Sequence, residues 1–325
     1  MIKLMGGIRS ILEASMAVKP GEHVLVIADS EGRSMWVCQA IVNMANSMGA
    51  EAVMSVVARE QLAQGEGAGE PPAAIATAIK SVNAVFRVSD ISNWVHSNAR
   101  KEATAAGVRY YVIGEIPLED LEQGIAAEDL RLIKERTEKV AQRLTEAKVA
   151  RVTSPSGTNI TLNLTGREGE AHHPLSHIVG GLPYYSEAAI APVEGTAEGI
   201  IVADLAMVQW GYRLREPLHL TVRAGKVTDI SGSTQDADRL RKMVAMDENA
   251  SNIAELGIGT SHIIPWAMHG TRRDAGRIGT GHIGIGRNND IGGKTWSRIH
   301  QDTVLSPARI ELDGHCILTE GALLI

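Results

Sequence analysis

The sequence predicts two domains: an α/β domain with a parallel sheet over residues 1–147, and a β-rich α+β domain over residues 148–325. In the first part, apolar strand-like segments alternate with helical segments, which is the rhythm of parallel βαβ units. Beyond about residue 148, short strands separated by Gly, Asn and Pro turns dominate. Nine of the eleven histidines follow residue 170, so we expect the chemistry to belong to the second domain.

The first domain opens with an amphipathic helix, after which apolar runs alternate with helical periodicity. The expected strands are residues 23–29, 51–57, 82–88 and 108–113. The expected helices are residues 34–48 and 72–80. Residues 127–147 are charged and rich in helix formers, so they are expected to form a long helix leading out of the domain.

The second domain is expected to contain mostly strands. These are residues 150–153, 159–164, 218–223 and 226–230. One helix, at residues 235–246, interrupts them. This change of pattern after the long helix is what predicts a separate, β-rich domain.

Composition and charge limit the class of protein. The chain has 325 residues, 44% hydrophobic residues and a net charge of −6, as expected of a globular protein. Mild acidity and a single Phe argue against nucleic acid as a partner, because a basic surface and stacking aromatic residues would be expected. No apolar run reaches the roughly 18 residues of a membrane span. The N-terminus lacks a signal-peptide pattern, and Cys38 and Cys316 have no zinc-site spacing, so a cytoplasmic protein with no membrane partner is expected.

A segment near the C-terminus carries the clearest functional pattern. His282 lies among glycines in residues 279–286, and residues 297–302 contain the His-x-Asp pair His300 and Asp302. In an extended strand, residues i and i+2 point to the same face, so this imidazole and carboxylate can converge on one metal ion. His282, on a second Gly-rich strand, is the candidate for a third ligand.

Two carboxylates in apolar runs extend the candidate set. Glu187 and Glu255 each lie in an apolar, strand-like run. Burying a carboxylate in such a strand is costly unless it is paired or coordinates a cation. The five residues together predict a mononuclear or dinuclear metal site.

Other patterns have simpler interpretations. Residues 279–284 satisfy G-x-G-x-x-G, but the residues that follow cannot form a helix, so a dinucleotide site is not expected there. His172, His173 and His177 cluster beside a proline, where a polar loop is a simpler interpretation than a metal site.

The candidate residues resemble the metallopeptidase superfamily of the aminopeptidase T type (peptidase family M29). That family shows a Glu ahead of P-x-E-G-T, a second Glu in E-x-A/G-φ-G, a His in H-φ-A/G-φ-G and a closing S-x-I-H-x-D. The corresponding segments here are residues 187–196, 255–259, 282–286 and 297–302. The match covers most of the chain, although the chain is shorter than typical members. The resemblance implies two cobalt or zinc ions held by Glu187, Glu255, His282, His300 and Asp302, and a metal-activated water that attacks a peptide carbonyl.

Two positions depart from the peptidases. Arg277 stands where they carry an acidic residue, and Asn289 where they carry a catalytic tyrosine. A shortened branch of the superfamily, the 2,5-dihydroxypyridine 5,6-dioxygenases, holds one Fe(II) with two histidines and the aspartate of an H-x-D pair. That branch places a histidine at the position of Glu255, so His282 would have to be the second imidazole here.

We therefore expect a metalloenzyme that hydrolyses a C–N bond of a small molecule or short peptide, with Glu187 or Glu255 as general base. A ring-cleaving Fe(II) dioxygenase is the alternative. A binding protein with a structural metal is a third hypothesis, disfavoured because structural zinc sites are richer in Cys and His. The candidates for contact with the substrate are His172, His173, Tyr184 and Asn289. By resemblance, a homodimer or larger homo-oligomer is expected.

Overall fold

The computed structural model describes residues 2–30, 34–58, 69–89, 94, 97–113, 118–175, 184–208, 210–264, 270–305 and 307–325. These residues form two compact units. Unit 1 contains the described residues up to Lys134 and those of residues 172–185; unit 2 contains residues 135–171 and the described part of residues 186–325. The chain passes between them within helix α6 (Ala127–Glu146). The expected boundary between residues 147 and 148 corresponds to the end of this helix and stays a prediction.

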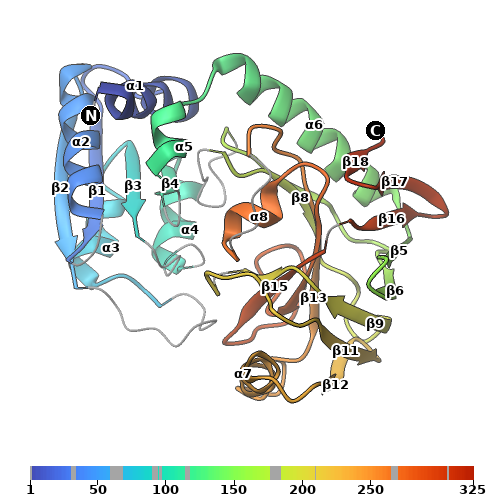
Figure 1. Ribbon diagram of the computed structural model, residues 1–325. Helices are drawn as coiled ribbons and strands as arrows, with labels where there is room; N and C mark the ends of the chain where they lie inside the picture. The colour runs from blue at the N-terminus through green and yellow to red at the C-terminus, as the bar shows by residue number, and fades with distance from the viewer. Residues whose placement is uncertain are drawn as a thin grey trace. The chain divides into compact units, whose positions relative to one another are not determined.

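Unit 1 is built on a parallel sheet with the strand order β2-β1-β3-β4. The strands are β1 (His23–Asp29), β2 (Glu51–Val57), β3 (Ala84–Val88) and β4 (Arg109–Ile113). Strands β1 and β3 are buried almost throughout, as expected where helices cover both faces of a parallel sheet. Figure 1 shows the four strands with the helices that connect them.

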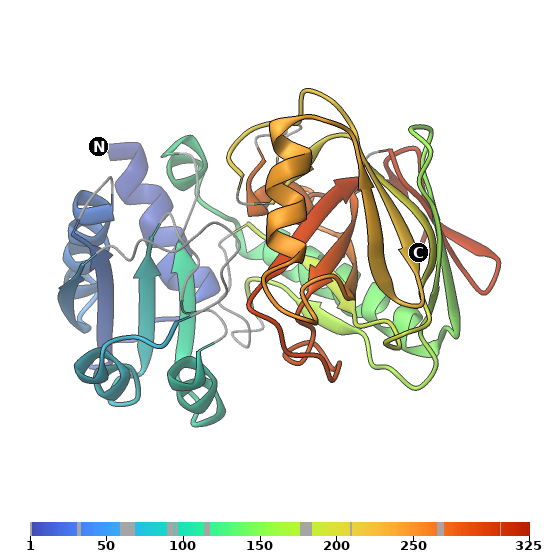
Figure 2. The ribbon, with the colours of Figure 1, turned by 90° about the horizontal axis from the view of Figure 1, so that it is seen from below.

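The helices of unit 1 pack against one another. They are α1 (Ile2–Ser10), which continues as a π-helical turn (Ile11–Ser15), α2 (Ser34–Ser47), α3 (Ala73–Ile79), α4 (Asn98–Ala105) and α5 (Leu118–Gln123). Helix α1 contacts α5 as well as α2, and α3 contacts α4 (Figure 2). The sequence did not predict helix α4, because the helix is polar and its few apolar residues give only a weak helical periodicity. The helix begins at Ser97, whose hydroxyl accepts a hydrogen bond from the backbone N–H of Arg100.

Unit 2 contains two antiparallel sheets. The six-stranded sheet has the order β10-β15-β14-β13-β8-β7 and comprises β7 (Glu170–His172), β8 (Glu187–Ile190), β10 (Ala206–Met207), β13 (Ile253–Gly259), β14 (Gly281–Gly286) and β15 (His300–Leu305). The eight-stranded sheet has the order β12-β11-β9-β6-β5-β16-β17-β18 and comprises β5 (Val149–Thr153), β6 (Asn159–Asn163), β9 (Glu198–Ala203), β11 (Leu218–Arg223), β12 (Lys226–Ser231), β16 (Arg309–Leu312), β17 (His315–Thr319) and β18 (Ala322–Leu323).

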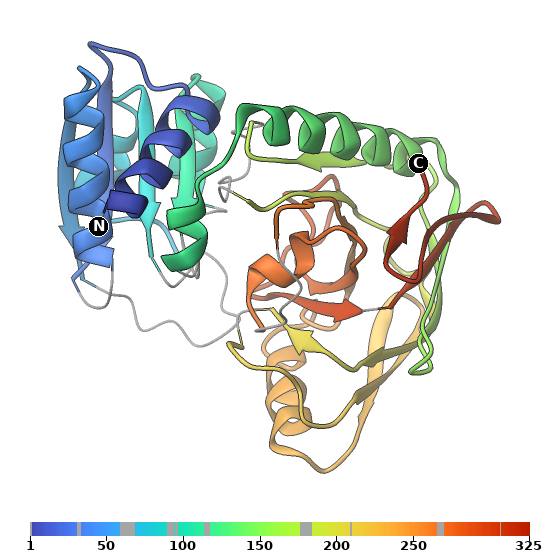
Figure 3. The same cartoon turned by 45° about the horizontal axis from the view of Figure 1, so that its top comes forward.

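One hydrophobic core joins these two sheets. It includes Leu256 and Ile283 from the six-stranded sheet and Val152 from the eight-stranded sheet, all fully buried. Helix α6 adds Leu144, and α7 (Gln235–Val244) adds Leu240. Figure 3 shows these helices with the strands of this unit. A short helix, α8 (Arg272–Gly276), precedes β14. The predicted fold class, a parallel α/β domain plus a β-rich α+β domain, is confirmed.

Among the helices of the described residues, none is both long enough and apolar enough to cross a membrane.

Candidate metal centre

Strands β8, β13, β14 and β15 bring the five candidate ligands to one face of the six-stranded sheet. Directly opposite residues of paired strands point to the same face. The register places each ligand opposite a glycine: Glu187 opposite Gly259, His282 opposite Gly257, Glu255 and Asp302 opposite Gly284, and His300 opposite Gly286. The ligand side chains therefore share one face, and each has a residue without a side chain directly opposite it on a neighbouring strand.

These glycines are required by close approach. A Cβ atom at Gly257 would lie 1.9 Å from Nε2 of His282, and one at Gly284 would lie 2.8 Å from Cβ of Glu255. The alternate residues of the same strands, such as Leu256 and Ile283, point into the core of unit 2. In β13 and β14, the alternation of ligand or glycine with Leu or Ile thus produces one apolar face and one face open to side-chain donors.

The donor atoms form two groups that share Glu255. The first contains Glu187, Glu255 and His282, and the second contains Glu255, His300 and Asp302; within each group the donor atoms lie within 4.8 Å of one another. Nε2 of His282 lies 3.0 Å from Oε2 of Glu187 and 3.5 Å from Oε1 of Glu255. Nε2 of His300 lies 2.9 Å from Oε2 of Glu255 and 3.1 Å from Oδ1 of Asp302. The carboxylate of Glu255 therefore directs one oxygen toward each histidine.

The donor set fits a divalent metal. His282 is 1% exposed, and among the described residues neither of its ring nitrogens has a partner in hydrogen-bonding geometry. The same is true of the buried Oδ1 atom of Asp302. Buried polar atoms normally have partners, so donors that converge without hydrogen-bonding one another indicate a site for an ion. Carboxylate and imidazole donors suit zinc, cobalt and iron.

The histidines and carboxylates shift one another's protonation. Burial alone would lower the pKa of His282, but the carboxylates of Glu187 and Glu255, followed by that of Asp302, raise it well above its usual value. Burial likewise opposes protonation of His300, whereas Asp302 and then Glu255 raise its pKa well above the usual value. Burial raises the pKa of Asp302, but the charge of His300 and then of His282 makes the net shift downward. Without metal, protonated imidazoles balance the carboxylates, and a bound ion replaces those protons.

A backbone carbonyl orients His300. Its Nδ1 atom lies 2.7 Å from the carbonyl oxygen of Arg287. A carbonyl can only accept, so Nδ1 carries the hydrogen, and in the neutral ring Nε2 has the lone pair that faces Glu255 and Asp302. This is the tautomer that a metal-binding imidazole needs at Nε2.

Glu194, which lies in the P-x-E-G-T segment, anchors the loop between β14 and β15. It accepts hydrogen bonds from the backbone N–H of Lys294 at 2.7 Å and from Nδ2 of Asn288 at 3.0 Å, and it pairs with Arg167. Burial raises the pKa of Glu194, but these partners make the net shift downward. The loop contains Arg287, so Glu194 supports the carbonyl that orients His300. The sequence motif carried this residue, although its role was visible only in the structure.

The roles of the other predicted residues stay untested. His172 ends β7, the strand next to β8 in the six-stranded sheet, and His173 follows it; both are buried, as is Tyr184. Asn289 is exposed in the loop between β14 and β15. Their predicted contact with a substrate stays a prediction. His177 lies outside the described residues. Arg277, at the position of the peptidase acid, is half-buried and donates to the carbonyl oxygen of Ile278 at 2.7 Å.

The fold and this donor set define the class of metal-binding enzymes expected from the sequence. The chain belongs to the family of 2,5-dihydroxypyridine 5,6-dioxygenases (NicX), whose family model matches residues 3–325. No curated protein sequence matches the chain at a significant level.

Two solved structures share the fold over nearly the whole chain. The 2,5-dihydroxypyridine dioxygenase from Pseudomonas putida KT2440 superposes with a TM-score of 0.82 at 20% sequence identity, covering 98% of this chain and 96% of that one. Wild-type AmpT from Thermus thermophilus superposes with a TM-score of 0.71 at 14% identity, covering 99% of both chains. At these identities the likeness shows the fold. Both branches of the expected superfamily are represented, so the predicted resemblance is confirmed.

Proposed function

We propose that this protein is a metal-dependent hydrolase that cleaves a C–N bond of a small molecule or short peptide. The position of Glu255 is the observation that carries the proposal. Its two carboxylate oxygens face His282 and His300 separately, so the five residues form two donor groups with a shared carboxylate. A carboxylate shared between two donor groups is the arrangement expected of a two-metal hydrolytic centre.

Each residue has a distinct task in this proposal. Glu187 and His282 would hold one ion, His300 and Asp302 the other, with Glu255 between them. When bound, such ions polarise a carbonyl and lower the pKa of a water molecule. Glu187 is the better candidate for general base, because both oxygens of Glu255 are directed at histidines. Glu187 would take a proton from the attacking water and return it to the leaving nitrogen as the C–N bond breaks.

The second candidate is a ring-cleaving Fe(II) dioxygenase, and the family membership favours it. The family model matches residues 3–325. An Fe(II) centre of that type requires two imidazoles and one carboxylate on a single ion. Among the described residues, neither donor group contains both His282 and His300. This geometry is why we place hydrolysis first.

Metal content and oxygen dependence separate the two candidates. The purified protein should contain two divalent ions per chain, and Zn²⁺ or Co²⁺ should support hydrolysis of aminoacyl anilides under argon. Oxygen uptake with Fe(II) and a panel of dihydroxypyridines should stay at the level of the metal-free protein. Oxygen-dependent loss of a dihydroxypyridine, without anilide hydrolysis, would establish the dioxygenase instead.

The small-molecule or short-peptide substrate, the homo-oligomeric state and the cytoplasmic location belong to the same proposal. Size-exclusion chromatography with light scattering tests the oligomeric state directly.

A further inference from the structure

The face of the six-stranded sheet opposite the ligands carries buried polar side chains directly behind them. Gln301 lies between His300 and Asp302 on β15 and is 2% exposed. Ser186 precedes Glu187, and Thr260 follows Gly259; both are fully buried. Because adjacent residues of a strand point to opposite faces, these side chains lie behind the ligands rather than among them.

The carboxamide of Gln301 fastens β15 where the strand carries its ligands. Its Oε1 atom accepts a hydrogen bond from Nε1 of Trp210 at 3.0 Å, and its Nε2 atom donates to the carbonyl oxygen of Val208 at 2.8 Å. On β15, the neighbouring strand β10 pairs with Thr303 and Val304. Beyond that pairing, Gln301 attaches β15 to the residues that follow β10. The backbone N–H of Val208 also donates to the carbonyl oxygen of Asp302, at 3.0 Å.

Trp210 is itself held from the other side. The guanidinium of Arg239 lies 4.1 Å from the centre of the indole ring, within the range of a cation–π interaction. Nη1 of Arg239 donates to the hydroxyl of Tyr212 at 3.0 Å, and that hydroxyl donates to Asp236 at 2.7 Å. These contacts fix the direction in which the indole N–H reaches Gln301.

A second, separate group lies behind Glu187. The hydroxyl oxygens of Thr137, Ser186 and Thr260 are 2.6 to 2.8 Å from one another, so they form a closed triangle. Each hydroxyl has one hydrogen to donate, which is enough for every member to donate once and accept once. Thr137 belongs to α6, so the triangle ties the start of β8 and the end of β13 to that helix.

We propose that these two groups position the two halves of the metal centre independently. The Gln301–Trp210 pair sets the affinity of the His300–Asp302 half, and the Thr137–Ser186–Thr260 triangle sets the affinity of the Glu187–His282 half. The inference rests on the proposed two-ion centre. Its physical basis is that the partners behind metal ligands restrict their orientation, and loss of such partners typically weakens metal binding about 10- to 100-fold.

The test is a titration of the metal-free full chain with Co²⁺, followed by visible absorption and by metal content after dialysis. Gln301→Leu removes the three carboxamide hydrogen bonds, to Trp210, Val208 and the carbonyl of Asp302, and should weaken one of the two Co²⁺ equivalents about 10- to 100-fold. The other equivalent should change much less, because Gln301 lies on β15 between His300 and Asp302, whereas the hydroxyl triangle lies behind Glu187. Trp210→Phe keeps an aromatic ring over Arg239 but removes the N–H donor, so it should weaken the same equivalent less.

Two further variants complete the design. Thr137→Val opens the hydroxyl triangle. It should lower the affinity for the Co²⁺ ion whose binding Gln301→Leu leaves unchanged. Thr303→Val is the matched control, because Thr303 lies on the same strand and face as Gln301 and is fully buried, and within the described part of the chain its hydroxyl has no hydrogen-bond partner. It should leave both equivalents unchanged.

The outcomes separate failure of this inference from failure of the proposed function. A wild-type chain that binds a single ion would overturn the two-ion centre. Two wild-type ions with equal loss of both in Gln301→Leu would show a general structural effect and overturn independent positioning, as would two ions whose affinities no variant changes.

Discussion

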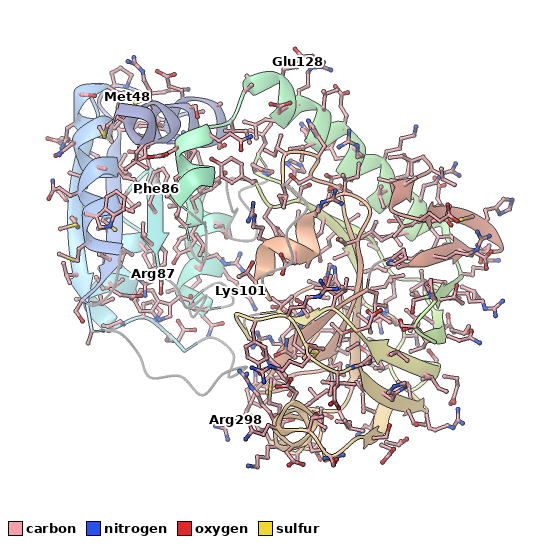
Figure 4. The ribbon with its side chains drawn as sticks, viewed as in Figure 1. Met48, Phe86, Arg87, Lys101, Glu128 and Arg298 are labelled. Carbon is pink, nitrogen blue, oxygen red and sulfur yellow. The ribbon has the colours of Figure 1, made fainter. Side chains whose placement is uncertain are left out.

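Both units bury charged side chains on a sheet, but they balance the charge in different ways. In unit 1 the carboxylate of Asp29, at the end of β1, pairs with Arg87 on β3 and accepts a hydrogen bond from Ser89 at 2.5 Å. The guanidinium of Arg87 also lies 4.4 Å from the centre of the Trp94 ring. Figure 4 labels Arg87 in unit 1. In unit 2, three carboxylates face two histidines, which are cations only when protonated.

This difference separates a permanent cluster from an exchangeable one. Arg carries its charge at every ordinary pH, so a buried Asp–Arg pair needs nothing from solution. Protonated histidines can release their protons to make room for a metal ion. A buried cluster rich in carboxylates and closed by histidine is therefore the one expected to exchange protons for ions, and its effects should appear in metal content rather than in folding alone.

The largest expected effect comes from removing one half of the metal centre. His300→Ala with Asp302→Ala should eliminate one ion and lower kcat/KM by about 1,000-fold or more, because the metal supplies several kcal/mol of charge stabilisation. Metal analysis and steady-state kinetics measure both quantities. A doubly substituted protein that keeps two ions would show that the ligands are assigned wrongly.

A smaller but still large effect is expected at the glycine beneath His282. Gly257→Ala places a methyl group where Nε2 of His282 lies, 1.9 Å from the new Cβ, so it should weaken one metal equivalent by at least about 10-fold. Gly281→Ala is the matched control on β14, because the nearest atom to its Cβ is the end of the Ile310 side chain at 3.0 Å. The control should destabilise the fold by about 1–3 kcal/mol at most and leave metal affinity unchanged.

The corresponding change in unit 1 should affect stability alone. Asp29→Asn leaves Arg87 buried without its carboxylate and should lower the free energy of unfolding by about 3–5 kcal/mol. Urea denaturation with the metal-loaded chain measures this loss, and metal content should stay at the wild-type value. Loss of bound metal in a folded Asp29→Asn protein would contradict the separation of the two clusters.

The smallest effect is a pH dependence of the metal-free protein. The pKa values of His282 and His300 are raised on folding. Protonation of these histidines therefore stabilises the metal-free fold fully below their unfolded pKa of about 6.5. This contribution is lost as pH rises through the raised pKa values. The pKa of Asp302 is lowered, so its contribution is present above about pH 4 and is lost as pH falls through the lowered value.

Metal affinity should change in the opposite direction over the alkaline part of this range. The ion displaces protons from His282 and His300, so affinity should rise with pH through their raised pKa values. Denaturation in the presence of chelator, and calorimetry in two buffers of different ionisation enthalpy, measure the two trends. A metal affinity that does not change with pH, with no proton release, would contradict the exchange of protons for ions.

Much of the fold and of the candidate site was predictable because its signals are local. The alternation of β13 and β14 places Leu and Ile on one face and a ligand or glycine on the other, and it can be read from a few consecutive residues. The two-residue spacing of His300 and Asp302 also places them on one face without further information. Helix α4 was not predicted, because its only sequence features are a serine cap and two buried alanines within a polar segment.

The sequence by itself determined the strand periods, the glycines and the identity of the five candidate donors. Only the tertiary structure decided that Glu255 stands between two histidines, and that Gln301 and Trp210 meet behind β15. The physical reason is the separation along the chain of the residues that set each feature. Side-chain alternation follows from the geometry of one strand, whereas the register of β8, β13, β14 and β15 depends on pairing between segments far apart in the chain. The chemistry of this face arises from that register.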